Sequence, residues 1–237
     1  MFINSQYFIY MIPAFILMAL TSWYVRATYA RWSRIPARSQ MTGYQAAQRL
    51  IERGGLYNIQ IEGTAGNLTD HYDPHRKTLA LSRGVAESAS VASLAIAAHE
   101  LGHALQDKEE YFPLRLRSAL VPMVQIGSNF GWILIILGLF LSYSGMALGV
   151  DIAWLGVAAF AGGAVFALAT LPVELNASKR ARQLLADTGL IQGEDEQRGV
   201  NSVLNAATLT YVAAVVTAVL QLLYYVSLVG GLGRRRR

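Results

Sequence analysis

Two histidines and a glutamate in one short segment are the residue types that hydrolytic metal sites use. The stretch AHELGHALQ places His99 and His103 four positions apart, with Glu100 beside the first. On a helix, residues four apart share a face, so both imidazoles can bind one zinc ion at roughly 2.0–2.1 Å. Glu100 is displaced around the helix and can reach a water molecule as a general base. The spacing therefore predicts a zinc centre that activates water, whose pKa zinc lowers to about 7.

The same letters also fit an ordinary helix with a polar face, since the motif alone is a moderate signal. Ala97, Ala98 and Ala104 flank the motif, so its polar side chains fall in an apolar helix, where unpaired ones are costly. The motif holds two of the four histidines in the chain. The chain has no cysteine, so a metal must be held by His, Asp or Glu. These observations favour the metal site.

The composition indicates that the motif lies beside a bilayer. Hydrophobic residues make up 54% of the 237 residues and charged residues 15%, a balance unusual for a soluble domain. A helix of roughly 20 apolar residues crosses a bilayer core. Four segments are about long enough, at residues 8–25, 126–148, 152–171 and 206–229. The basic residues flank these segments without interleaved aromatic residues, so we expect a lipid bilayer and no nucleic acid as partner.

The first apolar segment and the distribution of Lys and Arg predict the orientation. Arginines follow the first segment rather than precede it, which favours an uncleaved anchor over a signal peptide. Residues 26–117 hold 12 Lys and Arg, residues 179–198 hold 4, and the tail 234–237 holds 4. With four spans, this excess places 26–125 and 173–205 in the cytoplasm. The RRRR tail opposes this orientation, unless the fourth segment does not span fully.

Between the first two apolar segments, the sequence predicts a small unit of helices and strands. Thr42 is a suitable N-cap for an amphipathic helix, and Gly54 and Gly55 end it. The segment YNIQIEG has strand character, and NLTDHYD and KTLALS flank the turn-rich DPHR as a β-hairpin. Ser90 opens the helix that carries both histidines, and the charged DKEE ends it.

Glu174, in the segment LPVELNASKRARQLL, is the expected third ligand. It lies where the chain returns from the second and third apolar segments to the side of the histidines, and Pro172 suggests a helix start there. The alternative is a carboxylate favoured by the dipole of a first helical turn. We expect His99, His103 and Glu174 to converge at the membrane surface.

Together these motifs resemble the YugP-type membrane zinc metallopeptidases, which are distantly similar to HtpX and CAAX-prenyl membrane peptidases. The resemblance rests on LTDHYDPHRKTLALS, AAHELGHALQ and LPVELNASKRA, and covers about residues 44–225. It implies a gluzincin-like site in a bacterial membrane protein. In that site His99, His103 and Glu174 are the zinc ligands and Glu100 is the base.

One departure from the HtpX-like pattern Glu-x-x-Ala-Asp affects the orientation of the ligands. Ala177 is followed by Ser178 instead of an aspartate. Ser178 or Asn176 is then expected to orient a ligand histidine through a weaker hydrogen bond. The resemblance also suggests that Leu79–Ser82 is an edge strand that pairs with an extended substrate, and the alternative is a plain structural strand.

Other polar residues carry weaker predictions. His71 and His75 flank a turn, and we expect both to be solvated rather than to bind a metal. Arg180, Arg182 and Tyr211 are candidates for stabilising the oxyanion of a tetrahedral intermediate, or else anchors at the membrane surface.

The predicted fold is a mainly α-helical integral membrane protein, with about four transmembrane helices and a small zincin-like α+β cytoplasmic catalytic unit. The expected division is a first transmembrane helix at 1–25, a cytoplasmic segment with the HExxH helix at 26–125, a transmembrane hairpin at 126–172, a cytoplasmic helical segment with the third ligand at 173–205, and a fourth transmembrane helix with the basic tail at 206–237.

The predicted function is that of a zinc-dependent endopeptidase of the bacterial plasma membrane, which hydrolyses a peptide or membrane-protein substrate at the cytoplasmic face. The alternative is a non-catalytic membrane scaffold or chaperone-like module with a structural metal site. A site-2-type intramembrane protease is disfavoured, because the motif helix is short and no predicted span contains an interior aspartate. The sequence leaves the oligomeric state open.

Overall fold

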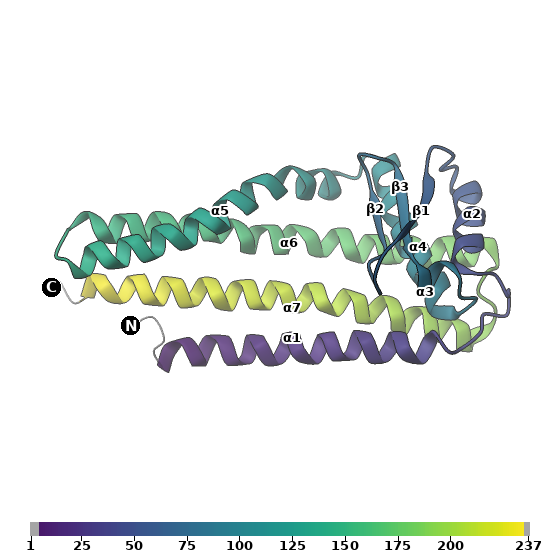
Figure 1. Ribbon diagram of the computed structural model, residues 1–237, viewed down its shortest axis with the longest axis horizontal. Coiled ribbons are helices and arrows are strands. Elements are labelled where there is room, and N and C mark those ends of the chain that lie inside the picture. The colour runs from purple at the N-terminus through teal and green to yellow at the C-terminus, as the bar shows by residue number, and fades with distance from the viewer. Residues whose placement is uncertain (1–4, 235–237) are drawn as a thin grey trace. The chain divides into compact units, whose positions relative to one another are not determined.

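The computed structural model describes residues 5–234 and the side chains of residues 5–231, and most of these residues are helical (Figure 1). Residues 1–4 and 235–237, which include most of the basic tail, lie outside the described residues. The elements in chain order are α1 (Ser5–Trp32), α2 (Gly43–Gly54), β1 (Gln60–Thr64), β2 (His71–Asp73), β3 (Thr78–Ser82), α3 (Arg83–Ala86), α4 (Val91–Lys108), α5 (Phe112–Tyr143), α6 (Leu148–Thr188) and α7 (Gly193–Arg234).

The chain forms two compact units. The helical unit contains residues up to Leu20, Leu116–Leu171 and residues from Tyr211 onward. The mixed unit contains Thr21–Arg115 and Pro172–Thr210.

The helical unit is made from the apolar parts of α1, α5, α6 and α7. Within residues 5–234, these four helices are long and apolar enough to cross a membrane, as the sequence predicts. Gly138 of α5 lies so close to α6 that a Cβ there would collide with the backbone nitrogen of Ala153. Small residues at such contacts let helices approach closely in lipid. A buried cluster of Ile135, Leu139, Ala153, Val157 and Val229 joins α5, α6 and α7.

The mixed unit is built on a three-stranded sheet with the order β1-β3-β2. β1 pairs with β3 in parallel, and β2 pairs with β3 antiparallel as the predicted hairpin. Thr42 forms a capping box at the start of α2, and Gly55 ends that helix at φ 61°. Ser90 caps α4, whose apolar residues pack with α2 and β3 in one core.

Leu79–Ser82 is not an edge strand, which corrects one prediction. β3 lies in the centre of the sheet, with β1 on one side and β2 on the other. The backbone nitrogen of Ser82 also donates to Asp70 Oδ1 at 2.7 Å. All five residues of β3 are buried, as is typical of a strand covered on both faces. An extended substrate therefore cannot pair along this strand.

Pro172 does not lie near a helix start, which corrects a second prediction. It lies inside α6, and Glu174 is an interior residue of the same helix. A proline removes one backbone hydrogen bond, yet apolar helices of membrane proteins tolerate it where neighbouring groups compensate. Thr170 before the proline and Val173 and Ala177 after it are buried, and this packing favours continuation of the helix. The dipole explanation for Glu174 therefore does not apply.

Candidate metal centre

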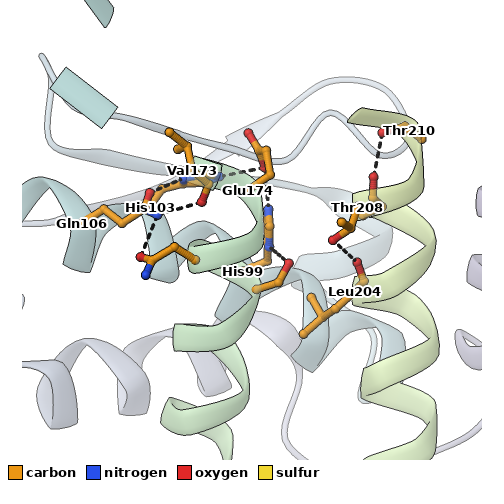
Figure 2. Close-up of polar contacts among 11 residues, drawn as sticks. His99, His103, Gln106, Val173, Glu174, Leu204, Thr208 and Thr210 are labelled. Carbon is orange, nitrogen blue, oxygen red and sulfur yellow. Dashed lines mark hydrogen bonds and ion pairs between the residues drawn. The ribbon is translucent and has the colours of Figure 1, made fainter. Parts of the chain in front are cut away.

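Three side chains from two helices of the mixed unit meet in a buried cluster. His99 and His103 project from one face of α4, and Glu174 faces them from α6 (Figure 2). Glu174 Oε2 lies 3.3 Å from His99 Nε2 and 3.4 Å from His103 Nε2. Glu174 is 1% exposed, and His99 is 9% exposed. The convergence expected from the sequence is therefore present in the fold.

A close contact between α4 and α6 brings the carboxylate within reach of the histidines. Gly102 lies between the two histidines in the sequence, and a Cβ there would collide with the backbone carbonyl of Ala177. Ala98 and Ala104, on either side of the motif, are also buried. The missing side chain at Gly102 thus lets α6 approach until Glu174 and the imidazoles share one site.

Each histidine has a hydrogen-bond partner on the ring nitrogen that faces away from the carboxylate. His99 Nδ1 lies 3.2 Å from Ser178 Oγ, which is the weaker contact that the sequence predicts in place of an aspartate. His103 Nδ1 lies 3.0 Å from Gln106 Oε1. Asn176 instead accepts a hydrogen bond from Gln106 Nε2 at 3.0 Å. Such partners orient ligand imidazoles in metal sites.

Sequence reasoning missed Gln106. The signal that could have found it is its position three residues after His103, because residues three apart are neighbours on one helix face.

Glu100 lies next to this cluster and remains partly exposed. Burial of its carboxylate raises the pKa of Glu100, and the nearby His99 and His103 oppose that rise. A carboxylate whose pKa lies above its ordinary value is a better proton acceptor and can later donate the proton.

The cluster fits a zinc ion by its donor chemistry and its geometry. The candidate ligand atoms of His99, His103 and Glu174 all lie within 4.8 Å of one another. Two imidazoles and one carboxylate form the donor set of catalytic zinc sites with three protein ligands, which leave a fourth position open. The two other ring nitrogens already have partners, so the three atoms that face one another are the ones available for a metal.

Comparison with known proteins shows which family the chain belongs to. The family model described as "Putative neutral zinc metallopeptidase" matches residues 7–230. The chain belongs to this family. The "Putative membrane protease YugP" of Bacillus subtilis (strain 168) is 40% identical over 203 residues, which are 85% of this chain and 87% of that protein. No solved structure matches the chain significantly. The predicted resemblance is thereby confirmed, and a zinc peptidase family implies zinc as the metal.

His71, His75 and Arg180, which the sequence also singled out in this zinc peptidase family member, are not among the candidate ligands. His71 and His75 are exposed, and His71 Nδ1 lies 2.9 Å from the carbonyl of Thr69. Arg180 forms a two-pronged ion pair with Glu109, with both distances at 2.7 Å. The exposure of His71 and His75 agrees with the solvated state predicted for these two histidines.

Of the two further candidates for the oxyanion role, Arg182 lies on α6 and Tyr211 on α7. Arg182 donates to Asn201 Oδ1 at 2.8 Å and to Asn205 Oδ1 at 2.7 Å, so it joins α6 to α7. Tyr211 lies on α7 in the helical unit.

Proposed function

We propose that this protein is a membrane-embedded zinc-dependent endopeptidase that hydrolyses peptide bonds at the cytoplasmic face of the plasma membrane. The observation that carries the proposal is the buried meeting of His99, His103 and Glu174, with Glu100 directly beside it. Membership of a zinc metallopeptidase family and the similarity to a membrane protease support the same activity.

Each residue of the cluster has a role in this proposal. His99, His103 and Glu174 would hold zinc through Nε2, Nε2 and the carboxylate. Zinc, when bound, supplies a Lewis acid that polarises the scissile carbonyl and lowers the pKa of water to about 7. Glu100 accepts a proton from the attacking water and delivers it to the leaving amine nitrogen. The residue is partly exposed as a whole, while burial of its carboxylate raises the pKa of this proposed base.

The proposed substrate is a peptide or a segment of a membrane protein close to the bilayer. Four apolar helices support a location in the membrane. The excess of Lys and Arg in residues 26–117 and 179–198 supports a cytoplasmic position for the residues of the site.

The decisive experiment compares wild type with Glu100→Gln. We expect the variant to retain stoichiometric zinc and to lose hydrolysis by about 10²- to 10⁴-fold, the usual contribution of a general base. Purified proteins in detergent are assayed on fluorogenic peptides, and the proteomes of cells expressing each form are compared for cut membrane proteins. Glu87→Gln is the matched control, because Glu87 is exposed just after α3 and pairs with Arg83. Equal cleavage by Glu100→Gln and wild type would show that Glu100 is not the base.

A second experiment separates the enzyme from a scaffold with a structural metal. We expect wild type to contain one zinc per chain and the double variant His99→Ala, His103→Ala to contain none. Zinc that survives loss of both histidines would place the metal at other ligands. Zinc in wild type together with identical proteomes for wild type and Glu100→Gln would favour the scaffold.

A further inference from the structure

Gln106 is a fully buried amide that makes hydrogen bonds at both ends of its side chain. Its Oε1 lies 3.0 Å from His103 Nδ1, one turn earlier in α4. Its Nε2 donates to the backbone carbonyl of Val173 at 2.8 Å and to Asn176 Oδ1 at 3.0 Å, both on α6. Figure 2 shows Gln106 beside His103, with Val173 on the facing helix. The amide therefore joins a candidate zinc ligand to two groups that lie on the other helix.

The partners of Gln106 allow only one orientation of its amide. The carbonyl of Val173 can only accept a hydrogen bond. Asn176 Oδ1 also accepts from Arg180 Nε at 2.6 Å, and a guanidinium can only donate. The NH₂ group of Gln106 must therefore face α6, and its oxygen must face His103. Because that oxygen can only accept, His103 Nδ1 must carry the proton.

The donor and acceptor roles along this hydrogen-bond chain are set by Arg180 near the surface, and the chain ends at the candidate ligand His103. Arg180 is held by Glu109 through two hydrogen bonds of 2.7 Å, and its guanidinium lies 5.8 Å from the ring centroid of Tyr111. The resulting chain runs from Arg180 through Asn176 and Gln106 to His103 Nδ1. With its proton held on Nδ1, the neutral ring can bind a metal only through Nε2, the atom that lies 3.4 Å from Glu174 Oε2.

On Nδ1, the other histidine has a partner whose polarity is not fixed. The hydroxyl of Ser178, 3.2 Å from His99 Nδ1, can rotate and either donate or accept. Gln106 thus does for His103 what a carboxylate does for ligand histidines in many zinc sites.

We propose that Gln106 is a positioning residue that fixes the ring and the tautomer of His103, so that Nε2 faces the metal. The inference rests on the proposed function, because it requires that His103 binds zinc. Its physical basis is that an imidazole held in the binding orientation loses less freedom when the metal arrives, and that its Nδ1 proton is already fixed on the side away from the metal.

The test measures the zinc dissociation constant of the full-length protein in detergent by competition with a chromophoric chelator. Gln106→Met keeps the length of the side chain and removes the acceptor, so we expect zinc affinity to fall about 10- to 100-fold. Gln48→Met is the matched control, because Gln48 is exposed on α2 and its Nε2 contacts only the hydroxyl of Tyr44 among the contacts described. We expect this control to bind zinc as wild type does.

Gln106→Glu distinguishes positioning from simple stability. A glutamate still accepts from His103 Nδ1, but it confronts the oxygens of Val173 and Asn176 without donors. We expect Gln106→Glu to melt no higher than Gln106→Met and yet to bind zinc at least about tenfold more tightly, since acceptors of this kind raise affinity about 10- to 100-fold. A purely structural role would instead rank zinc affinity in the order of the melting temperatures.

The outcomes separate this inference from the proposed function. Zinc in wild type, with Gln106→Met within twofold of wild type, would overturn the role of Gln106 and leave the zinc site in place. Equal affinities for Gln106→Met and Gln106→Glu would also overturn it. Wild type without stoichiometric zinc would overturn both proposals.

Discussion

At the scale of single residues, the two histidines differ in how firmly they are held. His103 bonds to an amide whose orientation is set by α6, whereas His99 bonds to the hydroxyl of Ser178. A hydroxyl contributes a weaker and less directional contact than a carboxylate or a fixed amide. The serine at this position therefore sets how tightly His99 is oriented.

We expect Ser178→Ala to weaken zinc binding about tenfold, at the low end of the range for outer partners of ligand histidines. The change removes the contact to His99 Nδ1 but leaves the three candidate ligands in place. The measurement is the zinc dissociation constant, with Ser178→Asp as a companion that supplies a carboxylate. An unchanged constant in Ser178→Ala would mean that its hydroxyl does not orient His99.

At the scale of elements, the site depends on how closely α4 and α6 approach. Gly102 faces the backbone carbonyl of Ala177, so the contact leaves no space for a side chain. In an exposed helix interior, replacing Gly with Ala usually stabilises by about 1 kcal/mol. Here the same change would force the helices that hold the histidines and Glu174 apart.

We expect Gly102→Ala to lower the free energy of unfolding by about 1–3 kcal/mol, as overpacking does, and to weaken zinc binding. Gly162→Ala in α6 is the matched control, because no atom lies within 4 Å of a Cβ added there. Thermal unfolding in detergent, together with zinc titration, measures both effects. The packing argument fails if Gly102→Ala is as stable as Gly162→Ala.

Zinc should also tie the two helices together, because α4 supplies two ligands and α6 supplies the third. We expect a chelator to lower the melting temperature of wild type, since free zinc at 100 times its dissociation constant stabilises by about 2.7 kcal/mol. The double variant His99→Ala, His103→Ala should melt at one temperature with or without chelator. Calorimetry of the four samples is the measurement, and a chelator effect of equal size in both proteins would contradict a site on these histidines.

At the scale of the whole molecule, the chain combines a helical unit with a mixed unit that holds the whole candidate site. His99, His103 and Glu174 all belong to the mixed unit. The four apolar helices alternate with the polar segments along the chain, so the charge distribution should decide which segments face the cytoplasm.

Because the chain has no cysteine, single introduced cysteines can report this topology. Asn67 lies in the exposed loop between β1 and β2, and Ser144 is exposed between α5 and α6. We expect an impermeant maleimide to label Ser144→Cys in intact cells and Asn67→Cys only after the cells are opened. The reverse pattern would place the site outside the cytoplasm.

The local features of the site were predictable because each depends on residues close together in the chain. The spacing of His99 and His103 puts them on one face of any helix that includes both. Ser90 and Thr42 cap helices through their own neighbours, and the apolar segments predict the four long helices. The donor types, without cysteine, already point to a zinc site of imidazoles and carboxylate.

How distant segments meet depends on packing that the local sequence does not show. Glu174 reaches the histidines as an interior residue of α6, past Pro172, because small residues let α4 and α6 touch. β3 is central because it pairs in parallel with the earlier β1 as well as antiparallel with β2, and the sequence of β3 does not show which strands will lie beside it. The proposed role of Gln106 likewise depends on hydrogen bonds to Val173 and Asn176. These residues follow it by about 70 positions and come close to it only because α4 and α6 pack together. Residue types and helical period were enough to indicate which groups could bind zinc. Which of these groups face one another depends on packing between helices. The contacts involved are made by residues far apart in the chain.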